Sequence, residues 1–254
     1  MLRKCLIACL GYWLALAAIA DDSTWSVATG IDYSSGKYGQ SKRTETRYMP
    51  LTLKHEAGPW TLRATVPYVE TTGPAGVVGG GVDRVTTTTS RTGSGKAAGL
   101  GDVVVGGSWT AFQAAGTLLD LGLKAKLATG DESIGLSTGK NDYSLQADLY
   151  RTMRAHTVFV TLGFRKMGDP AGTDFRDPLY SSIGWSYRAS PEISTGLSYD
   201  YRQRLLATGA PVGESTAFLS WKLDSAWKLQ TYAVAGFTRA SPEWGGGVLL
   251  FYTH

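Results

Sequence analysis

The sequence predicts an all-β fold, a transmembrane antiparallel up-and-down β-barrel of about twelve strands. Three observations predict it: side-chain polarity alternates with a period of two, long and short links alternate along the chain, and the chain begins with an export signal. The composition agrees, because 32 glycines and 13 tyrosines suit tight turns and strands, and 43% hydrophobic residues is low for a helical membrane protein. We therefore expect a signal peptide over 1–20 and a barrel domain over 21–254.

The first twenty residues have the pattern of a secretory signal peptide. Arg3 and Lys4 give a positive start, an uncharged apolar stretch runs to Ala18, and cleavage is predicted near Ala20. A transmembrane anchor is the alternative, but the stretch is shorter than the ~20 apolar residues that cross a bilayer. A lipid anchor at Cys9 is a further alternative. Because both cysteines lie in this segment, we expect no disulfide and no thiolate metal site in the exported chain.

The stretch 117–129 shows the alternation most clearly. From 119 to 127 the odd positions hold leucine or alanine, whereas the even positions include Asp120, Lys124 and Lys126. A helix would mix these side chains around its axis, but a strand places them on opposite faces. Segments with such alternation are 24–34, 46–54, 60–70, 100–112, 117–129, 142–152, 157–167, 179–189, 193–203, 214–223, 227–237 and 244–254.

The links between these segments alternate in length. Links after odd-numbered segments are long, up to the stretch 71–99, whereas links after even-numbered segments are short turns. Outer-membrane barrels have long external loops and short periplasmic turns, and an even strand number places both termini in the periplasm. The alternative is a soluble lipocalin-like or sandwich protein, but twelve strands with the apolar face inward would enclose a core too wide to fill. We expect the stretch 71–99 to be an external loop or to fold into the mouth.

Tryptophans gather near the ends of the predicted strands, where amphipathic rings suit a membrane interface. They are Trp25, Trp60, Trp109, Trp185, Trp221, Trp227 and Trp244. The last segment places Val248, Leu250 and Tyr252 on one face, which resembles the C-terminal signal read by barrel-assembly machinery, although His254 replaces the usual final aromatic. We therefore predict a protein of the bacterial outer membrane. Its expected partners are lipid, the assembly machinery and a small solute, with a monomer favoured.

Two stretches resemble a known family. The residues from Gly99 to Gly107 read GLGDVVVGG, and 127–131 and 135–143 read LATGD and GLSTGKNDY. They are similar to the strand opening and the hairpin of the outer-membrane barrel family labelled for the MetA pathway of phenol degradation, with Ala128 in place of the usual proline. The resemblance implies a barrel transporter for small compounds, aromatic ones among them, and it transfers no catalytic residue.

Two stretches resemble enzyme motifs but lack the structural context or the residues that those motifs require. The stretch 135–139 matches G-x-S-x-G, but that motif needs a strand-to-helix turn and this one lies between two predicted strands. We expect His55, His156 and His254 at the periplasmic rim, a membrane thickness away from that serine. The stretch 90–97 lacks the first glycine and the final Ser or Thr of a phosphate loop. We predict no enzyme, no cofactor and no metal site, and the weak charge of +4 argues against nucleic-acid binding.

If the apolar faces meet lipid, the opposite faces line the lumen, where basic residues outnumber acidic ones. Charge in a pore selects ions by sign, although such residues can also pair into a network that only fills space. The residues expected to line the lumen are Arg63, Asp102, Asp120, Lys124, Lys126, Gln146, Asp148, Tyr150, Phe159, Arg165, Arg188, Asp200, Arg202, Phe218, Lys222, Lys228, Gln230 and Tyr232. We predict a channel or transporter for small anionic or aromatic solutes. The alternative is a non-conducting barrel that stabilises the membrane or displays loops for adhesion.

Overall fold

The computed structural model describes residues 23–74, 78–79, 86–87 and 95–254, and the regular structure within them is entirely β. The long strands are β1 (Ser23–Gly36), β2 (Thr44–Ala57), β3 (Trp60–Gly73), β7 (Val103–Ala114), β8 (Thr117–Leu127), β9 (Asp142–Met153), β10 (His156–Lys166), β11 (Leu179–Arg188), β12 (Ile193–Arg202), β13 (Val212–Lys222), β14 (Trp227–Gly236) and β15 (Trp244–Thr253). The short strands are β4 (Val78–Gly79), β5 (Thr86–Thr87) and β6 (Gly95–Leu100). The predicted signal peptide, and most of the predicted loop 71–99, lie outside the described residues.

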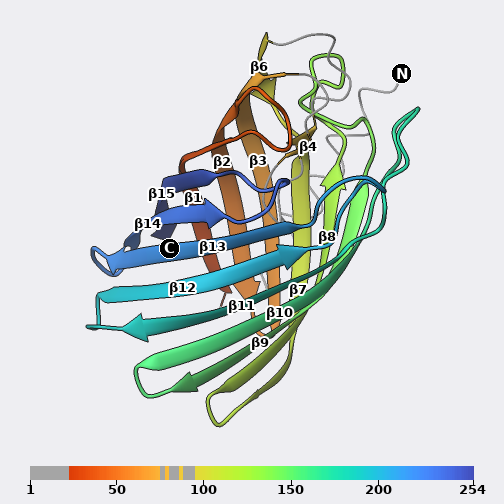
Figure 1. The fold of residues 1–254 in the computed structure, drawn as a ribbon. Helices are drawn as coiled ribbons and strands as arrows, with labels where there is room; N and C mark the ends of the chain where they lie inside the picture. Colours follow the sequence, from red (N-terminus) through yellow and green to blue (C-terminus); the bar gives the residue numbers. More distant parts are fainter. Residues whose placement is uncertain (1–22, 75–77, 80–85, 88–94) are drawn as a thin grey trace, which may run out of the picture.

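The sheet forms a closed barrel of twelve antiparallel strands with β6 as an additional strand (Figure 1). Each long strand pairs with its neighbours in chain order, and β1 closes the ring by pairing with β15 from Ser26 opposite Thr253 to Ser35 opposite Trp244. This confirms the predicted up-and-down barrel. The predicted segment 100–112 begins at the last residue of β6 and continues into β7, and both of these strands pair with β3.

The two ends of the barrel differ in their connections. Short turns join β2 to β3, β7 to β8, β9 to β10, β11 to β12 and β13 to β14, and we call this the turn end. Ala115 and Gly116 at the β7–β8 turn have φ angles of 48° and 78°, the left-handed values that a two-residue hairpin turn requires and that glycine adopts without strain. The longer links gather at the opposite end, the loop end, as the alternation of link lengths predicts.

The outer face of the wall is apolar over its middle. Leu123 of β8 is 65% exposed and Leu162 of β10 is 61% exposed, and exposed leucine, isoleucine or valine recurs on most other strands. An apolar surface that continues over most strands of a protein is rare on soluble monomers. A closed barrel also leaves no unpaired strand edge, so this surface is suited to a lipid bilayer. Within the described residues no helix is long and apolar enough to cross a membrane.

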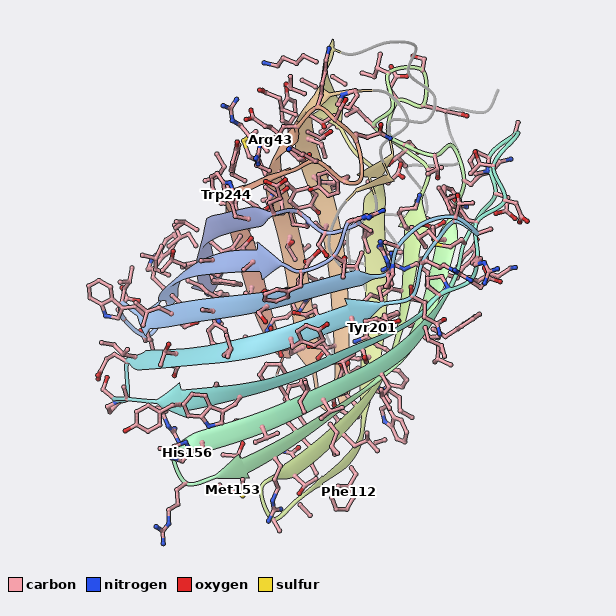
Figure 2. All side chains as sticks on the ribbon, viewed as in Figure 1. Arg43, Phe112, Met153, His156, Tyr201 and Trp244 are labelled. Atoms are coloured by element: carbon pink, nitrogen blue, oxygen red, sulfur yellow. The ribbon has the colours of Figure 1, made fainter. Side chains whose placement is uncertain are left out.

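Aromatic side chains border this apolar band at both ends. At the turn end the rings of Trp25 and His55 stack at 4.1 Å, and His156 stacks on Trp185 and Tyr187. Figure 2 shows His156 at this end with Phe112 and Met153, and Trp244 at the opposite end. There the ring centres of Trp244 and Tyr33 are 5.1 Å apart, and those of Tyr199 and Phe237 are 6.4 Å apart. Two aromatic belts on either side of an apolar band mark the two interfaces of a membrane.

Inside the barrel, aromatic rings lie over glycines of adjacent strands. The ring of Phe159 on β10 covers Gly184 on β11, and the ring of Phe218 on β13 covers Gly196 on β12. A Cβ atom at either glycine would overlap the ring. The same arrangement places the Tyr180 ring over Gly163 and the Tyr232 hydroxyl over Gly247. These glycines therefore make room for the far ends of large rings that project from the adjacent strands.

The seam between β1 and β15 has additional contacts. The hydroxyl of Tyr232 on β14 reaches past Gly247 of β15 and donates a hydrogen bond to Asp32 on β1. At the loop end Arg43 Nη2 lies 2.6 Å from Glu243 Oε2, which joins the links on either side of the seam. Side chains thus reinforce the one junction between strands that are far apart in sequence.

The strand register predicts a sharp difference between two leucines on the outer face. A lysine at Leu123, in the middle of β8, should cost about 2–4 kcal/mol of membrane stability, because its charge would lie near the bilayer midplane. The matched variant Leu179→Lys, at the loop-end start of β11, should cost at most ~1 kcal/mol. The measurement is the fraction of protein that folds into vesicles, scored by its heat-modifiable gel mobility. Equal folding of the two variants would contradict the register.

Candidate functional site in the barrel lumen

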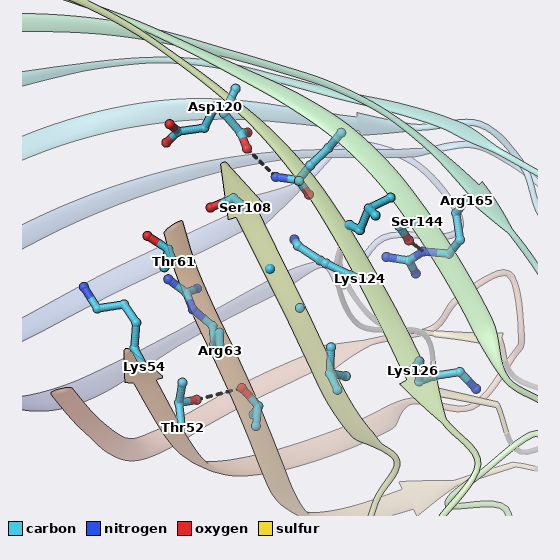
Figure 3. A pocket seen from close by; sticks show the side chains of 18 of the residues that line it. Thr52, Lys54, Thr61, Arg63, Ser108, Asp120, Lys124, Lys126, Ser144 and Arg165 are labelled. Carbon is cyan, nitrogen blue, oxygen red and sulfur yellow. Dashed lines mark hydrogen bonds between the residues drawn. The ribbon is translucent and has the colours of Figure 1, made fainter. Parts of the chain in front are cut away.

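A cavity of about 520 Å³ lies along the inner wall and is lined by β2, β3, β7, β8, β9 and β10. Figure 3 shows Lys54, Arg63 and Lys124 projecting from three of these strands. Hydroxyl groups accompany the charges, and those of Thr52 and Thr65 form a hydrogen bond of 2.9 Å. Cavities of several hundred Å³ with a few fixed polar groups are typical small-molecule sites.

Arg63 carries the accessible positive charge of this cavity. Its side chain is exposed to the lumen, and its guanidinium group forms no hydrogen bond or ion pair with any residue that the structure describes. Lys54 on the neighbouring strand is neutralised by Glu56, whose carboxylate lies 2.7 Å from the ammonium group. A planar guanidinium with free donors is suited to binding a carboxylate or phosphate in a bidentate manner.

A row of four polar side chains crosses the wall beside Arg63, from β7 to β10. The Thr110 hydroxyl donates to Asp120 at 2.7 Å, and the Thr161 hydroxyl donates to Asp148 at 2.6 Å. Asp120 and Asp148 are themselves register partners on β8 and β9. The side-chain amide of Gln146 also donates to Asp148, at 2.5 Å. The row brings acid groups into the same cavity as Arg63 and keeps them oriented by neutral donors.

Lys126, by contrast, is committed to a buried network at the loop end. Its ammonium group lies 2.9 Å from Asp102 and 3.4 Å from Asp142, and it donates to the Thr138 hydroxyl at 3.1 Å and to the Lys140 carbonyl at 2.9 Å. Its side chain is only 14% exposed. Lys126 therefore holds the barrel wall to the β8–β9 loop and is shielded from a passing solute. We call Lys126, Asp102 and Asp142 the loop lock.

The loop lock also holds the glycine at the start of the 128–141 loop. Asp102 also accepts the backbone N–H of Gly130 at 3.0 Å, which holds the start of the 128–141 loop against the break between β6 and β7. Leu136 at the loop's centre packs with Val69 and Ala97, whose side chains point inward from β3 and β6. The loop is thus folded inward across part of the barrel mouth.

Two carboxylates in the loops have lowered pKa values. Hydrogen bonds from the side chain and backbone of Ser133 lower the pKa of Asp131. A bond from the Lys166 ammonium group and one from the Met167 N–H lower the pKa of Asp177. A lowered folded-state pKa stabilises the loop above the ordinary carboxyl pKa, and the contribution is lost only as pH falls through the lowered value. Both loops are therefore held by ionised groups at neutral pH.

Most of the predicted lumen residues fall into three places. Those that line the cavity are Arg63, Asp120, Lys124, Lys126, Gln146, Asp148, Tyr150 and Arg165. Those that point inward elsewhere on the wall, by register, are Phe159 on β10 and Asp200, Arg202, Phe218 and Tyr232 on β12 to β14. Those that lie exposed at the turn-end rim are Arg188, Lys222 and Lys228. Arg188 donates there to the Arg154 carbonyl, and Lys228 lies 4.2 Å from the centre of the Phe251 ring.

The sequence analysis missed the inner face of β2. Lys54 and Glu56 line the cavity and alternate with the exposed Leu53, so the period-two pattern was present in the sequence. The serine motif is a loop element, because Ser137 is buried and its hydroxyl accepts the Gly139 N–H at 2.9 Å. His156 lies at the opposite end of the barrel. In the described ranges no three His, Cys, Asp or Glu residues come together as a metal site.

Solved structures of similar fold are outer-membrane porins. The "KdgM porin" has a TM-score of 0.55 and 10% identity, covering 89% of this chain and 98% of its own. The same porin "in complex with disordered oligogalacturonate" has a TM-score of 0.55 and 11% identity, covering 88% and 98%. The NanC porin has a TM-score of 0.54 and 8% identity, covering 89% and 98%. No family model and no curated protein matches the sequence. The fold is therefore that of an outer-membrane porin, and the phenol-degradation family name finds no support.

The loop lock predicts that Lys126 matters for stability. Lys126→Met removes the cation between two buried carboxylates, so the free energy of unfolding should fall by about 3–5 kcal/mol. Lys140→Met is the matched control, because it removes the same charge from an exposed side chain of the same loop. Urea unfolding in detergent or vesicles measures the difference. Equal unfolding midpoints for the two variants would show that the lock does not hold the loop.

Proposed function

We propose that this chain is an outer-membrane channel for the diffusion of small anionic or aromatic solutes. The observation that carries the proposal is a closed barrel whose polar interior holds a cavity lined by Arg63, which has no ion-pair partner among the described residues. A passage lined by fixed charge raises the local concentration of solutes of the opposite sign. Arg188, Lys222 and Lys228 at the turn-end rim extend the positive character to one opening.

The opposite wall supports the aromatic part of the proposal. Phe218 and Tyr232 project inward from β13 and β14, which stand six strands away from β7 and β8 around the ring of twelve. The far ends of their rings lie over Gly196 and Gly247 on the adjacent strands, so both rings lie along the inner wall. Flat aromatic faces bind planar apolar groups by offset stacking. A solute with a carboxylate and an apolar ring matches both walls.

Export and assembly complete the proposal. The leading segment would direct the chain across the inner membrane and be cleaved near Ala20. The last strand, with Val248, Leu250 and Tyr252 on its outer face, would be recognised by the barrel-assembly machinery. The loop end would then face the exterior and the turn end the periplasm. We expect the folded barrel to act as a monomer in lipid.

A second candidate is a non-conducting barrel with a structural or adhesive role. The inward fold of the 128–141 loop favours it, because Leu136 narrows the mouth and the loop lock fixes that position. Electrical recording separates the two candidates directly. A conducting barrel supports the channel, and a sealed barrel supports the structural role.

The channel predicts measurable anion preference. In planar bilayers with a potassium chloride gradient, the wild type should conduct, and its reversal potential should show preference for chloride. Arg63→Glu should reduce the chloride-to-potassium permeability ratio severalfold, because it replaces this lumenal cation by an anion. Arg47→Glu is the control, since Arg47 lies outside the lumen and pairs with Glu70.

A wild-type protein that folds yet passes no current would contradict the channel. Retained conductance with an unchanged reversal potential in Arg63→Glu would contradict the role of the lumenal cation. A shift of equal size in Arg47→Glu would trace the selectivity to overall charge instead of the lumen.

A further inference from the structure

Two carboxylates stand side by side on the lumen wall with neutral partners only. Asp120 and Asp148 are register partners on β8 and β9, and their hydrogen bonds come from threonine hydroxyls and one amide. Within the part of the chain that the structure describes, neither forms an ion pair. Like charges directly opposite one another destabilise a sheet, so this pair favours a cation close to both.

Arg63 lines the same cavity from β3. Its guanidinium group has no ion-pair partner among the described residues, so it favours an anion. Gly106 and Ser108 of β7 and Gly122 of β8 are the small residues of the wall between Arg63 and the two carboxylates, and the side chains of Lys124 and Gln146 border the two glycines. Tyr150 lines the same cavity as Arg63 and both carboxylates. The cavity therefore has a cationic side and an anionic side.

The remaining charges of the cavity are occupied. Glu56 pairs with Lys54, and Asp142 pairs with Lys126 in the loop lock. Arg165 is buried, donates to the Ser144 hydroxyl at 3.2 Å and lies over the Tyr180 ring. Lys124 also has an interaction partner. Arg63 and the Asp120–Asp148 pair are thus the groups left to bind a solute.

We propose that this cavity binds a small zwitterion, an amino acid whose carboxylate lies on Arg63 and whose ammonium group lies between Asp120 and Asp148. The inference rests on the proposed channel function, and it narrows the carboxylate-bearing solutes of that lumen to those that also carry an ammonium group. An ammonium group has three donors, enough to reach both carboxylates at once. A purely anionic solute would meet the two aspartates, and a purely cationic solute would meet Arg63, so each lacks half of the site. The size of the cavity, about 520 Å³, is ample for a molecule with a short carbon chain.

Three probes of equal chain length test the charge pattern: 4-aminobutanoate, butanoate and butylammonium. Isothermal titration calorimetry on the folded, detergent-solubilised barrel measures binding whether or not the barrel conducts. 4-Aminobutanoate should bind about tenfold more tightly than either single-charge probe, the difference made by one additional charge-assisted contact.

Isosteric variants assign the two sides of the site. Asp120→Asn with Asp148→Asn should bring 4-aminobutanoate to within about twofold of butanoate, because it removes the ammonium side and keeps acceptors for the threonines. Arg63→Gln should bring 4-aminobutanoate to within about twofold of butylammonium. Asp174→Asn and Arg47→Gln are the matched controls, since both residues lie outside the cavity. Heat-modifiable mobility verifies that each variant is folded, and Asp148→Asn alone replaces the double variant if the latter misfolds.

The outcomes separate this inference from the channel itself. Equal binding of the three probes, or no binding, overturns the zwitterion site even if the barrel conducts. Tight 4-aminobutanoate binding by a barrel that passes no current supports the site and contradicts the channel. Loss of the preference in the control variants as well would overturn the assignment of the site to Arg63, Asp120 and Asp148.

Discussion

Every backbone amide in the membrane-facing wall needs a partner within the sheet, because hydrocarbon offers neither donor nor acceptor. In this chain that demand can be met only if β15 returns to β1, since an open sheet would leave one edge of each unpaired. The glycine-rich start of β15 allows the Tyr232 side chain to reach past it to Asp32, so a side-chain contact spans the closing seam. Closure also encloses the lumen, and the site exists only as a consequence of it.

The period of two along each strand then determines which side chains meet lipid and which meet water. Once Leu123 faces outward, Lys124 and Lys126 must face inward, and the same constraint passes through the hydrogen-bonded register to every neighbour. The interior thereby collects charges that a soluble protein would place on its surface. Some of them pair locally, as in the loop lock, whereas Arg63 has no ion-pair partner among the described residues.

Strand positions, the closed topology and the end at which loops gather could be predicted from the sequence, since each depends on local alternation and link length. The pairings across strands could be predicted only where a short turn sets the register, as for Asp148 and Thr161 on β9 and β10. Asp120 and Asp148 are connected through the long 128–141 loop, so their juxtaposition follows from the whole barrel. A register shift between Thr110 and Phe112 likewise has no signal in the alternation.

The role of Lys126 illustrates the same limit. Its inward direction follows from the alternation on β8, but its partners come from the β6–β7 break and from the start of β9, so only the folded loop shows that its charge is neutralised. Lys54 and Glu56 differ, because their alternation was visible on β2 and a strand-by-strand comparison of both faces would have found them.

The inner width of the barrel depends on pairs of residues, each made of an aromatic ring and the glycine beneath it on the adjacent strand. Phe218 with Gly196, and Phe159 with Gly184, each form a unit in which one member supplies bulk and the other supplies room on the adjacent strand. Neither side chain takes part in the backbone hydrogen bonds between the strands. A smaller side chain in place of the ring, combined with a larger one in place of its glycine, would therefore keep both the filled volume and the strand register. Such compensated exchanges would move side-chain bulk from one strand to the next around the inner wall while the strand pairing stays the same.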